Sequence, residues 1–148
     1  MHSAVATLRY RIKREDLPLA VLPLDEQAFP SDYRPTLENS IWWVVWSGRE
    51  PVGYAGLRVC DRRQNKGLGF LSRAGVLREH RGHGLQRRLI RAREAEARAL
   101  GLNELVTYVA MWNCASLNSL ASCGYRFYRP ATKWGGKESL YLRKRLQS

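Results

Sequence analysis

The chain lacks the features that mark membrane and exported proteins. Its longest uninterrupted apolar stretch runs only from Ile41 to Trp46, far short of the roughly 20 residues that a membrane-spanning helix needs. The segment from Met1 to Arg11 alternates polar and apolar residues and has no apolar core of a secretory signal. The sequence therefore predicts a cytoplasmic protein with no membrane association.

Cysteine is scarce and unpatterned. The three cysteines, Cys60, Cys114 and Cys123, form an odd set without Cys-x-x-Cys or Cys/His ligand spacing. Neither a disulfide framework nor a zinc site is therefore indicated, and no Cys-His-Asp arrangement suggests a nucleophilic thiol. We expect free thiols, inert in packing, and no metal.

Acidic residues are also few. The 148 residues include 25 Lys and Arg against 13 Asp and Glu, for a formal charge of +12, and 45% of the chain is hydrophobic. This length and apolar content suit a single domain over residues 1–148 with its own core. The positive field favours anionic partners without saying which kind, because screened attraction does not distinguish phosphorylated cofactors from nucleic acid.

The first half of the chain reads as mostly β. Alternation over residues 7–13 predicts a strand, whereas residues 16–35 predict short helical turns broken by prolines at 18, 23 and 30. Residues 41–46 and 52–59 predict a hairpin, and residues 69–77 predict a third strand beside it. Trp42, Trp43 and Trp46 are expected in the sheet core.

The second half changes periodicity. Leu85, Leu89, Ala92, Glu96 and Ala99 recur at helical spacing from Gly84 to Leu100, with Arg87, Arg91, Glu94 and Arg98 on another, solvated face and a Glu94–Arg98 pair. Residues 105–110 then predict a strand parallel to the third, and Asn113 caps a helix to about Cys123. Strands over 125–128 and 139–145 complete a mixed α/β order.

The most informative stretch is VLREHRGHGLQ, residues 76–86. A strand ends, Gly82 and Gly84 allow a tight turn, and a helix begins at once, which leaves several backbone N–H groups unpaired. With the partial positive charge of the helix start, these donors predict an anion cradle suited to a pyrophosphate. Neither the Walker pattern nor the dinucleotide fingerprint is met, and His80 and His83 are expected to be exposed loop residues.

Residues 40 to 128 resemble the GNAT superfamily of acetyl-CoA-dependent N-acetyltransferases. The resemblance is carried by Val76 five residues before RGHGL, then RLI from Arg88, NCAS from Asn113, and Gly124 with its following tyrosine. The signature Gln/Arg-x-x-Gly-x-Gly/Ala fits in two imperfect frames, starting at Glu79 or at Arg81. The resemblance implies a single GNAT-type domain, with a mixed sheet of six to seven strands, a V-shaped splay and flanking helices.

The resemblance also implies a cofactor site and a reaction. Acetyl-CoA would be the co-substrate, with its diphosphate on the loop, its pantetheine along the exposed edge of the splayed strand and the thioester carbonyl polarised by the N–H near Val76. The residues implied for cofactor binding lie on that strand, in the loop, at the start of the helix after it, and after the next strand: Ala74, Val76, Arg81, Gly82, His83, Gly84, Leu85, Gln86, Arg87, Asn113, Ser116 and Asn118.

The general acid and base are less defined. Many GNAT enzymes carry a tyrosine seven residues after the asparagine, where this chain has Leu120. Ser119, Tyr108, Tyr128 or water could assist the departing thiolate instead. Arg73 stands on the strand where some family members place a base, and Glu38, Asp61 and Glu104 are candidates by charge only. The base is therefore unassigned.

The predicted function is acetyl transfer from acetyl-CoA to a primary amine by direct attack. Excess basic residues between Arg58 and Arg98 and between Arg126 and Arg145 argue against a polycationic acceptor and favour an anionic one, including RNA-linked amines such as aminoacyl-tRNA. A basic nucleic-acid-binding module and a CoA-binding fold without turnover are the alternatives. The last strands could also pair in a homodimer.

Overall fold

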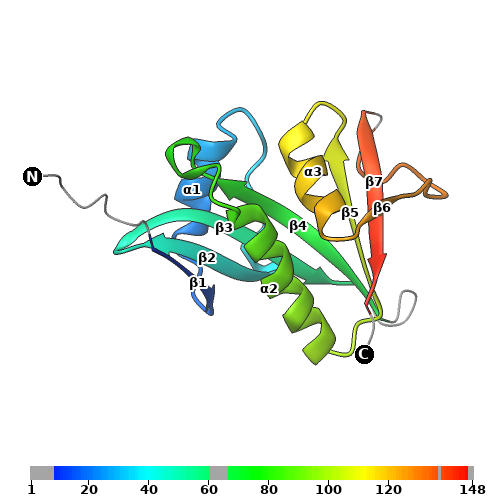
Figure 1. Ribbon diagram of the computed structural model, residues 1–148, viewed down its shortest axis with the longest axis horizontal. Helices are drawn as coiled ribbons and strands as arrows, with labels where there is room; N and C mark the ends of the chain where they lie inside the picture. Colours follow the sequence, from blue (N-terminus) through cyan, green and yellow to red (C-terminus); the bar gives the residue numbers. More distant parts are fainter. Residues whose placement is uncertain (1–8, 61–66, 137, 147–148) are drawn as a thin grey trace, which may run out of the picture.

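A seven-stranded mixed sheet forms the centre of the molecule (Figure 1). The computed structural model describes residues 9–60, 67–136 and 138–146. The strand order is β1-β2-β3-β4-β5-β7-β6, and every neighbouring pair is antiparallel except β4 and β5. The mixed sheet predicted from the sequence is therefore confirmed.

The elements follow the predicted order closely. The strands are β1 (Tyr10–Glu15), β2 (Ile41–Ser47), β3 (Glu50–Val59), β4 (Leu68–Val76), β5 (Glu104–Ala110), β6 (Arg126–Phe127) and β7 (Ser139–Arg145). The helices are α1 (Val21–Ala28), α2 (Leu85–Ala99) and α3 (Cys114–Ser122), with 3-10 turns η1 (Leu37–Asn39) and η2 (Arg78–His80). None of the helices in the described part of the chain is long and apolar enough to cross a bilayer.

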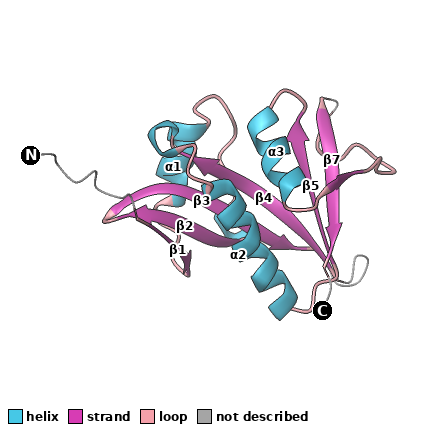
Figure 2. Ribbon diagram, in the orientation of Figure 1, coloured by secondary structure: helices cyan, strands magenta, loops and turns pink. Residues whose placement is uncertain are grey.

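Helices cover both faces of the sheet. Helices α2 and α3 lie on one face and α1 on the other (Figure 2), and a separate apolar cluster fills each side. Trp43 packs under α2, whereas Trp42, the next residue along β2, packs under α1. This alternation confirms that the tryptophans of β2 belong to the sheet core.

The sheet splits between its two parallel strands. β4 pairs with β5 only from Leu68 to Phe70. Beyond these residues the two strands no longer pair with each other and diverge (Figure 1), while β4 stays paired with β3 and β5 with β7. At the closed end, the Thr107 hydroxyl donates to the Leu71 carbonyl at 2.9 Å. The predicted V-shaped splay between β4 and β5 is therefore confirmed, and the C-terminal half of β4 has a free edge.

Two local predictions were wrong. Pro23 does not interrupt α1, because it lies in the first helical turn, where its missing N–H has no partner to lose. The first strand begins at Tyr10 and runs to Glu15, so it extends beyond the predicted end at Lys13; the predicted residues Thr7 and Leu8 lie outside the described part of the chain.

The buried face of α2 also differs from the prediction. Arg93 and Glu94 are buried alongside Leu89, whereas Ala99 is exposed. Glu94 is buried rather than on the predicted solvated face: it accepts hydrogen bonds from Tyr125 and from Lys144 on β7, the latter at 3.0 Å. The apolar periodicity missed this face because two charged residues occupy it.

Arg93 is buried because its guanidinium N–H groups bond to backbone carbonyls of β3 and β4. The β3–β4 register shifts between Ala55 and Leu57. The Arg93 guanidinium donates to the carbonyls of Gly56 at 3.2 Å and Ser72 at 3.5 Å at this irregularity. Burial lowers the pKa of Arg93 to about 10, so the side chain stays charged at neutral pH and stabilises the bulge next to the splay.

Candidate functional site

The loop between β4 and α2 presents a row of unpaired backbone donors. Gly82 and Gly84 adopt positive φ angles of 83° and 71°, and α2 begins immediately after them at Leu85. No described group accepts a hydrogen bond from the N–H groups of residues 82–87, whereas the N–H of Arg88 already donates to Gly84 at 3.2 Å. Six consecutive amides at a helix start are therefore available to an anion.

Contacts with two strands hold this loop in place. Arg81 Nε donates to the Val76 carbonyl at the end of β4 at 3.0 Å. The Tyr10 hydroxyl on β1 lies 3.0 Å from His80 Nδ1, and the Tyr10 ring also packs against His83 at 5.4 Å between centroids. His80 is therefore half-buried and hydrogen-bonded to Tyr10, contrary to the prediction. The sequence did not reveal that Tyr10 of β1 reaches this loop. His83 is exposed, as predicted.

The free edge of β4 carries further donors. The Leu77 N–H donates to Val52 on β3 at 2.8 Å. Because successive N–H groups of a strand point to opposite edges, the N–H groups of Val76 and Ala74 point away from β3, toward the gap. β5 does not pair with β4 at either residue. An extended group in the gap thus meets strand donors next to the loop amides.

The start of α3 forms the opposite side of the opening. Asn113 caps α3 by accepting the Ser116 N–H at 3.2 Å, as predicted. Asn118 is exposed on the same helix. The Ser119 hydroxyl donates to the Ala115 carbonyl at 3.1 Å, and Leu120, at the position where GNAT enzymes often carry a tyrosine, is buried in the main core.

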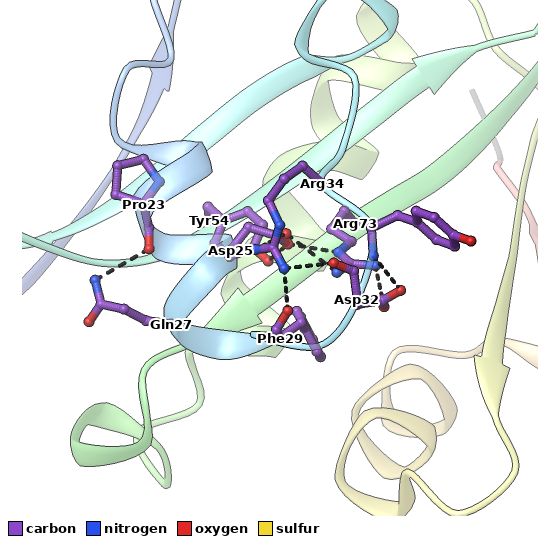
Figure 3. A network of polar contacts seen from close by, with 9 residues as sticks. Pro23, Asp25, Gln27, Phe29, Asp32, Arg34, Tyr54 and Arg73 are labelled. Atoms are coloured by element: carbon purple, nitrogen blue, oxygen red, sulfur yellow. Dashed lines mark hydrogen bonds and ion pairs between the residues drawn. The ribbon is translucent and has the colours of Figure 1, made fainter.

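A charged network that the sequence did not predict lies beside the gap, on the α1 side (Figure 3). Asp25 of α1 is fully buried and accepts hydrogen bonds from Tyr54 of β3 and from Arg73 Nε of β4, the latter at 2.7 Å. Arg34 contacts the second oxygen of Asp25 at 3.0 Å, and Arg73 also reaches Asp32 at 2.7 Å. Two guanidinium groups thus compensate one buried carboxylate.

The network shifts three pKa values. The hydrogen bond from the Tyr33 N–H lowers the pKa of Asp32, burial opposes this, and the Arg73 guanidinium lowers it further. Burial, and then the hydrogen bond to Asp25, raise the pKa of Tyr54. Burial acts to lower the pKa of Arg73, but its hydrogen bonds to Asp25 and Asp32 raise it overall. Arg73, which stands where some GNAT enzymes carry a base, is therefore a fixed cation that holds Asp32.

Aromatic side chains gather at the closed end of the gap. The ring of Tyr108 on β5 stacks on Phe70 of β4, with centroids 5.8 Å apart and an interplanar angle of 13°. Trp134, from the loop between β6 and β7, meets both rings edge-on at 5.3 and 5.2 Å. Sequence reasoning named Tyr108 but missed Trp134, because its loop carries no periodic pattern.

The other predicted acid and base candidates are dispersed. The guanidinium of Arg143 lies over Tyr128, with Cζ 4.7 Å from the centroid of the tyrosine ring. Glu38 is exposed on η1, and Glu104 is half-buried at the start of β5. Asp61 lies outside the described residues. The structure thus brings neither Glu38 nor Glu104 into contact with the loop amides.

The thiols are free in the described part of the chain, in line with the prediction. Cys123 is buried and Cys60 is half-buried, but Cys114, at the start of α3, is exposed. The expectation that Cys114 is a buried packing residue was therefore wrong, because the first turn of α3 faces outward.

A strongly basic groove of about 750 Å³ lies at the far end of the sheet. Arg126, Arg143, Lys144 and Arg145 line it, with Glu104 as the acidic member. β6 and β7 supply these four cations. The groove concentrates part of the net charge of the chain away from the loop amides and favours anionic ligands.

Comparison with known proteins gives a family match and fold matches. Residues 9–125 match the model of the acetyltransferase (GNAT) family. No curated protein sequence matches the chain. The fold resembles an acetyltransferase from Bacillus subtilis in complex with CoA, with 18% identity, a TM-score of 0.72, and coverage of 94% of this chain and 100% of that one.

Two further solved structures share the fold. The ribosomal-protein-S18-alanine N-acetyltransferase from Escherichia coli is 14% identical with a TM-score of 0.74, covering 95% of this chain and 96% of that one. A chain of the NatC complex bound to Gag peptide and CoA is 14% identical with a TM-score of 0.78, covering 95% and 100%. The family match over most of the sequence, with the splayed sheet and the glycine loop at its helix start, shows that the chain belongs to the GNAT family of acetyltransferases.

Proposed function

We propose that this chain transfers an acetyl group from acetyl-CoA to a primary amine by direct attack of the amine on the thioester. The observation that supports this most is the row of free N–H groups over residues 82–87, directly beside the free edge of β4. Such an arrangement suits a diphosphate joined to an extended amide chain.

The loop residues fit the diphosphate of acetyl-CoA. A Cβ atom added at Gly82 or Gly84 would meet no protein atom within 4 Å, so the space above both glycines is open. Oxygens of a diphosphate can therefore approach the amides from Gly82 to Arg87 closely. The exposed Arg87 side chain adds positive charge at the start of α2, and Arg81 and His83 complete the loop.

The edge of β4 fits the pantetheine arm. From Val76 back to Leu71, the free edge spans six residues, that is five steps or about 17 Å at about 3.3 Å per residue. The gap-facing N–H groups of Ala74 and Val76 pair with the pantetheine arm and hold the thioester carbonyl. Because the arm starts at the loop that follows Val76, its thioester end lies nearer Ala74 than Val76, and the Ala74 N–H is assigned to the carbonyl. Asn113, Ser116 and Asn118 contact the arm from the α3 side of the opening.

The reaction needs an unprotonated amine and a stabilised oxyanion. The lone pair of the amine attacks the thioester carbon, the carbonyl oxygen gains negative charge beside the Ala74 N–H, and collapse expels the CoA thiolate. Tyr108 is placed better than Ser119 or Tyr128 to protonate the thiolate. It stands on β5 near the closed end of the gap, whereas the Ser119 hydroxyl already donates to Ala115.

The test is acetyl-CoA binding and turnover with the whole chain. CoA should raise the melting temperature, and acetyl-CoA with a panel of primary amines should release free thiol faster than acetyl-CoA alone. Absence of both effects would contradict the proposal. A thermal shift without thiol release on any amine would instead establish a CoA-binding fold without turnover.

An anionic macromolecule as partner is the second candidate, and the basic groove on β6 and β7 favours it. If nucleic acid binds there, affinity should fall steeply with salt, because phosphate contacts release counterions. A melting-temperature rise with RNA or duplex DNA but not with CoA would favour this reading over the transferase.

We also propose that the chain works in the reducing cytoplasm, since its described cysteines are free.

A further inference from the structure

A second pocket, of about 650 Å³, opens on the α1 side of the sheet. Its floor is formed by Phe70 of β4 and by Val106 and Tyr108 of β5, and its outer wall by the β6–β7 loop with Trp134. This volume suits a small-molecule ligand. α1 covers β3 and β4 on this face but not β5 or β7, so the pocket lies next to the helix rather than beneath it.

The pocket begins where the gap between β4 and β5 closes. Phe70 is the last β4 residue paired with β5, and its partner there is Val106. The loop amides start α2, which packs on the opposite face of the sheet. A ligand in this pocket therefore reaches the closed end of the gap from the face opposite α2, leaving the loop and the β4 edge free for acetyl-CoA.

The inner part of the pocket is aromatic. Phe70 and Tyr108 are stacked, and Trp134 stands edge-on to both. Tyr108 is 40% exposed and Trp134 is 44% exposed. Aromatic surface that remains open to solvent beside a pocket favours a flat apolar group, because such a group can stack on one ring and cover the edge of another.

The outer part of the pocket is positively charged. Arg58 of β3 and Arg143 of β7 line it, with Glu104 as its acidic lining residue. Both arginines are exposed, and neither forms an ion pair with another described residue. The guanidinium of Arg143 lies over the Tyr128 ring, with Cζ 4.7 Å from the ring centroid, and the Arg143 side chain remains exposed, so it can still meet an anion.

We propose that this pocket binds the acceptor, and that the acceptor is a small aromatic amine that also carries a carboxylate. This inference rests on the proposed acetyl transfer. The ring of the acceptor lies against Tyr108 and Trp134, its carboxylate faces Arg143, and its amine points to the closed end of the gap. Attack forms the C–N bond of the amide, breaks the C–S bond and releases the amine proton and the CoA thiolate.

Four amines separate the contribution of the ring from that of the carboxylate. Phenylalanine has both groups, phenethylamine has only the ring, alanine has only the carboxylate, and ethylamine has neither. Covering an aromatic ring should raise kcat/KM about tenfold or more, and an exposed carboxylate–arginine contact should raise it about threefold to tenfold. Phenylalanine should therefore be the best substrate of the four.

Two variants test the two halves of the pocket separately. Trp134→Leu should reduce the advantage of phenylalanine over alanine about tenfold and leave its advantage over phenethylamine intact. Arg143→Gln should reduce the advantage of phenylalanine over phenethylamine and leave its advantage over alanine intact. Phe127→Leu and Arg49→Gln are matched controls, because Phe127 pairs with the core residue Leu142 and thus faces away from the pocket, and Arg49 is exposed in the β2–β3 turn. CoA-induced thermal shifts confirm that each variant is folded.

Direct binding separates failure of the pocket from failure of the transfer. Calorimetry should detect phenylalanine binding to the CoA-loaded protein, weakened in Trp134→Leu and Arg143→Gln but not in the controls. That result without any thiol release would keep the pocket and contradict the acetyl transfer. Equal kcat/KM for phenylalanine and ethylamine, or preference for spermidine, an acidic peptide or an RNA oligomer, would overturn the proposed acceptor class.

Discussion

The glycine loop can be tested by adding single methyl groups. Gly82→Ala and Gly84→Ala each place a Cβ on backbone with φ of 83° or 71°, where an L-residue is strained by about 1 kcal/mol. Neither Cβ meets a protein atom within 4 Å, so strain is the whole cost for the free protein. For a chain of this length, this corresponds to a melting-temperature decrease of about 2–4 °C.

Gly101 supplies the matched control. It follows α2, has φ of 76°, and its added Cβ would also meet nothing within 4 Å. Gly101→Ala should therefore destabilise the protein as much as Gly82→Ala or Gly84→Ala do. Only the loop variants place a methyl group in the space where diphosphate oxygens approach the amides.

The expected effect on CoA is larger than the effect on stability. Loss of one charge-assisted hydrogen bond, about 1.5–3 kcal/mol, weakens CoA binding roughly tenfold to a hundredfold. Calorimetric titration with CoA should show this loss for Gly82→Ala and Gly84→Ala, and wild-type affinity for Gly101→Ala. Unchanged affinity in both loop variants, or equal weakening in all three, would refute the reasoning.

Three further substitutions test the surroundings of the site. Asn113→Ala removes the cap of α3 and should cost about 1 kcal/mol in chemical denaturation; a change within error would show that the cap is dispensable. Glu94→Gln leaves the Lys144 ammonium without its anion and should cost about 3 kcal/mol, whereas a neutral result would show that this pair is not stabilising. The Tyr33 N–H and Arg73 lower the pKa of Asp32 from 3.8, so the ionised carboxylate stabilises the fold above that pH and this stabilisation is lost as the pH falls below it. Asp32→Asn should therefore reduce the loss of unfolding free energy at acidic pH, and an unchanged acidic loss would contradict this.

The sequence predicted the elements that depend on local pattern. The alternation around Tyr10, the apolar run of β2 and the cap at Asn113 each carry their own signal, because period-2 burial and side-chain capping act within a few residues. The loop at Gly82 and Gly84 was also visible, since positive φ angles favour glycine.

The features that sequence reasoning missed depend on contacts between distant segments. Glu94 and Arg93 occupy the inner face of α2 because Lys144 and the β3–β4 bulge supply partners from other strands. Asp25 is buried because Arg73 reaches it across the sheet from β4. No periodicity along one segment encodes such pairs, so Glu94 was assigned to the surface and Arg93 and Asp25 were not singled out.

A crystal structure with acetyl-CoA bound tests the central claim most directly. The predicted result is a diphosphate within hydrogen-bond distance of the N–H groups of residues 82–87, with the pantetheine amides paired to Ala74 and Val76. A diphosphate bound instead in the basic groove of Arg126 and Arg145, with the loop amides facing only solvent, would contradict it.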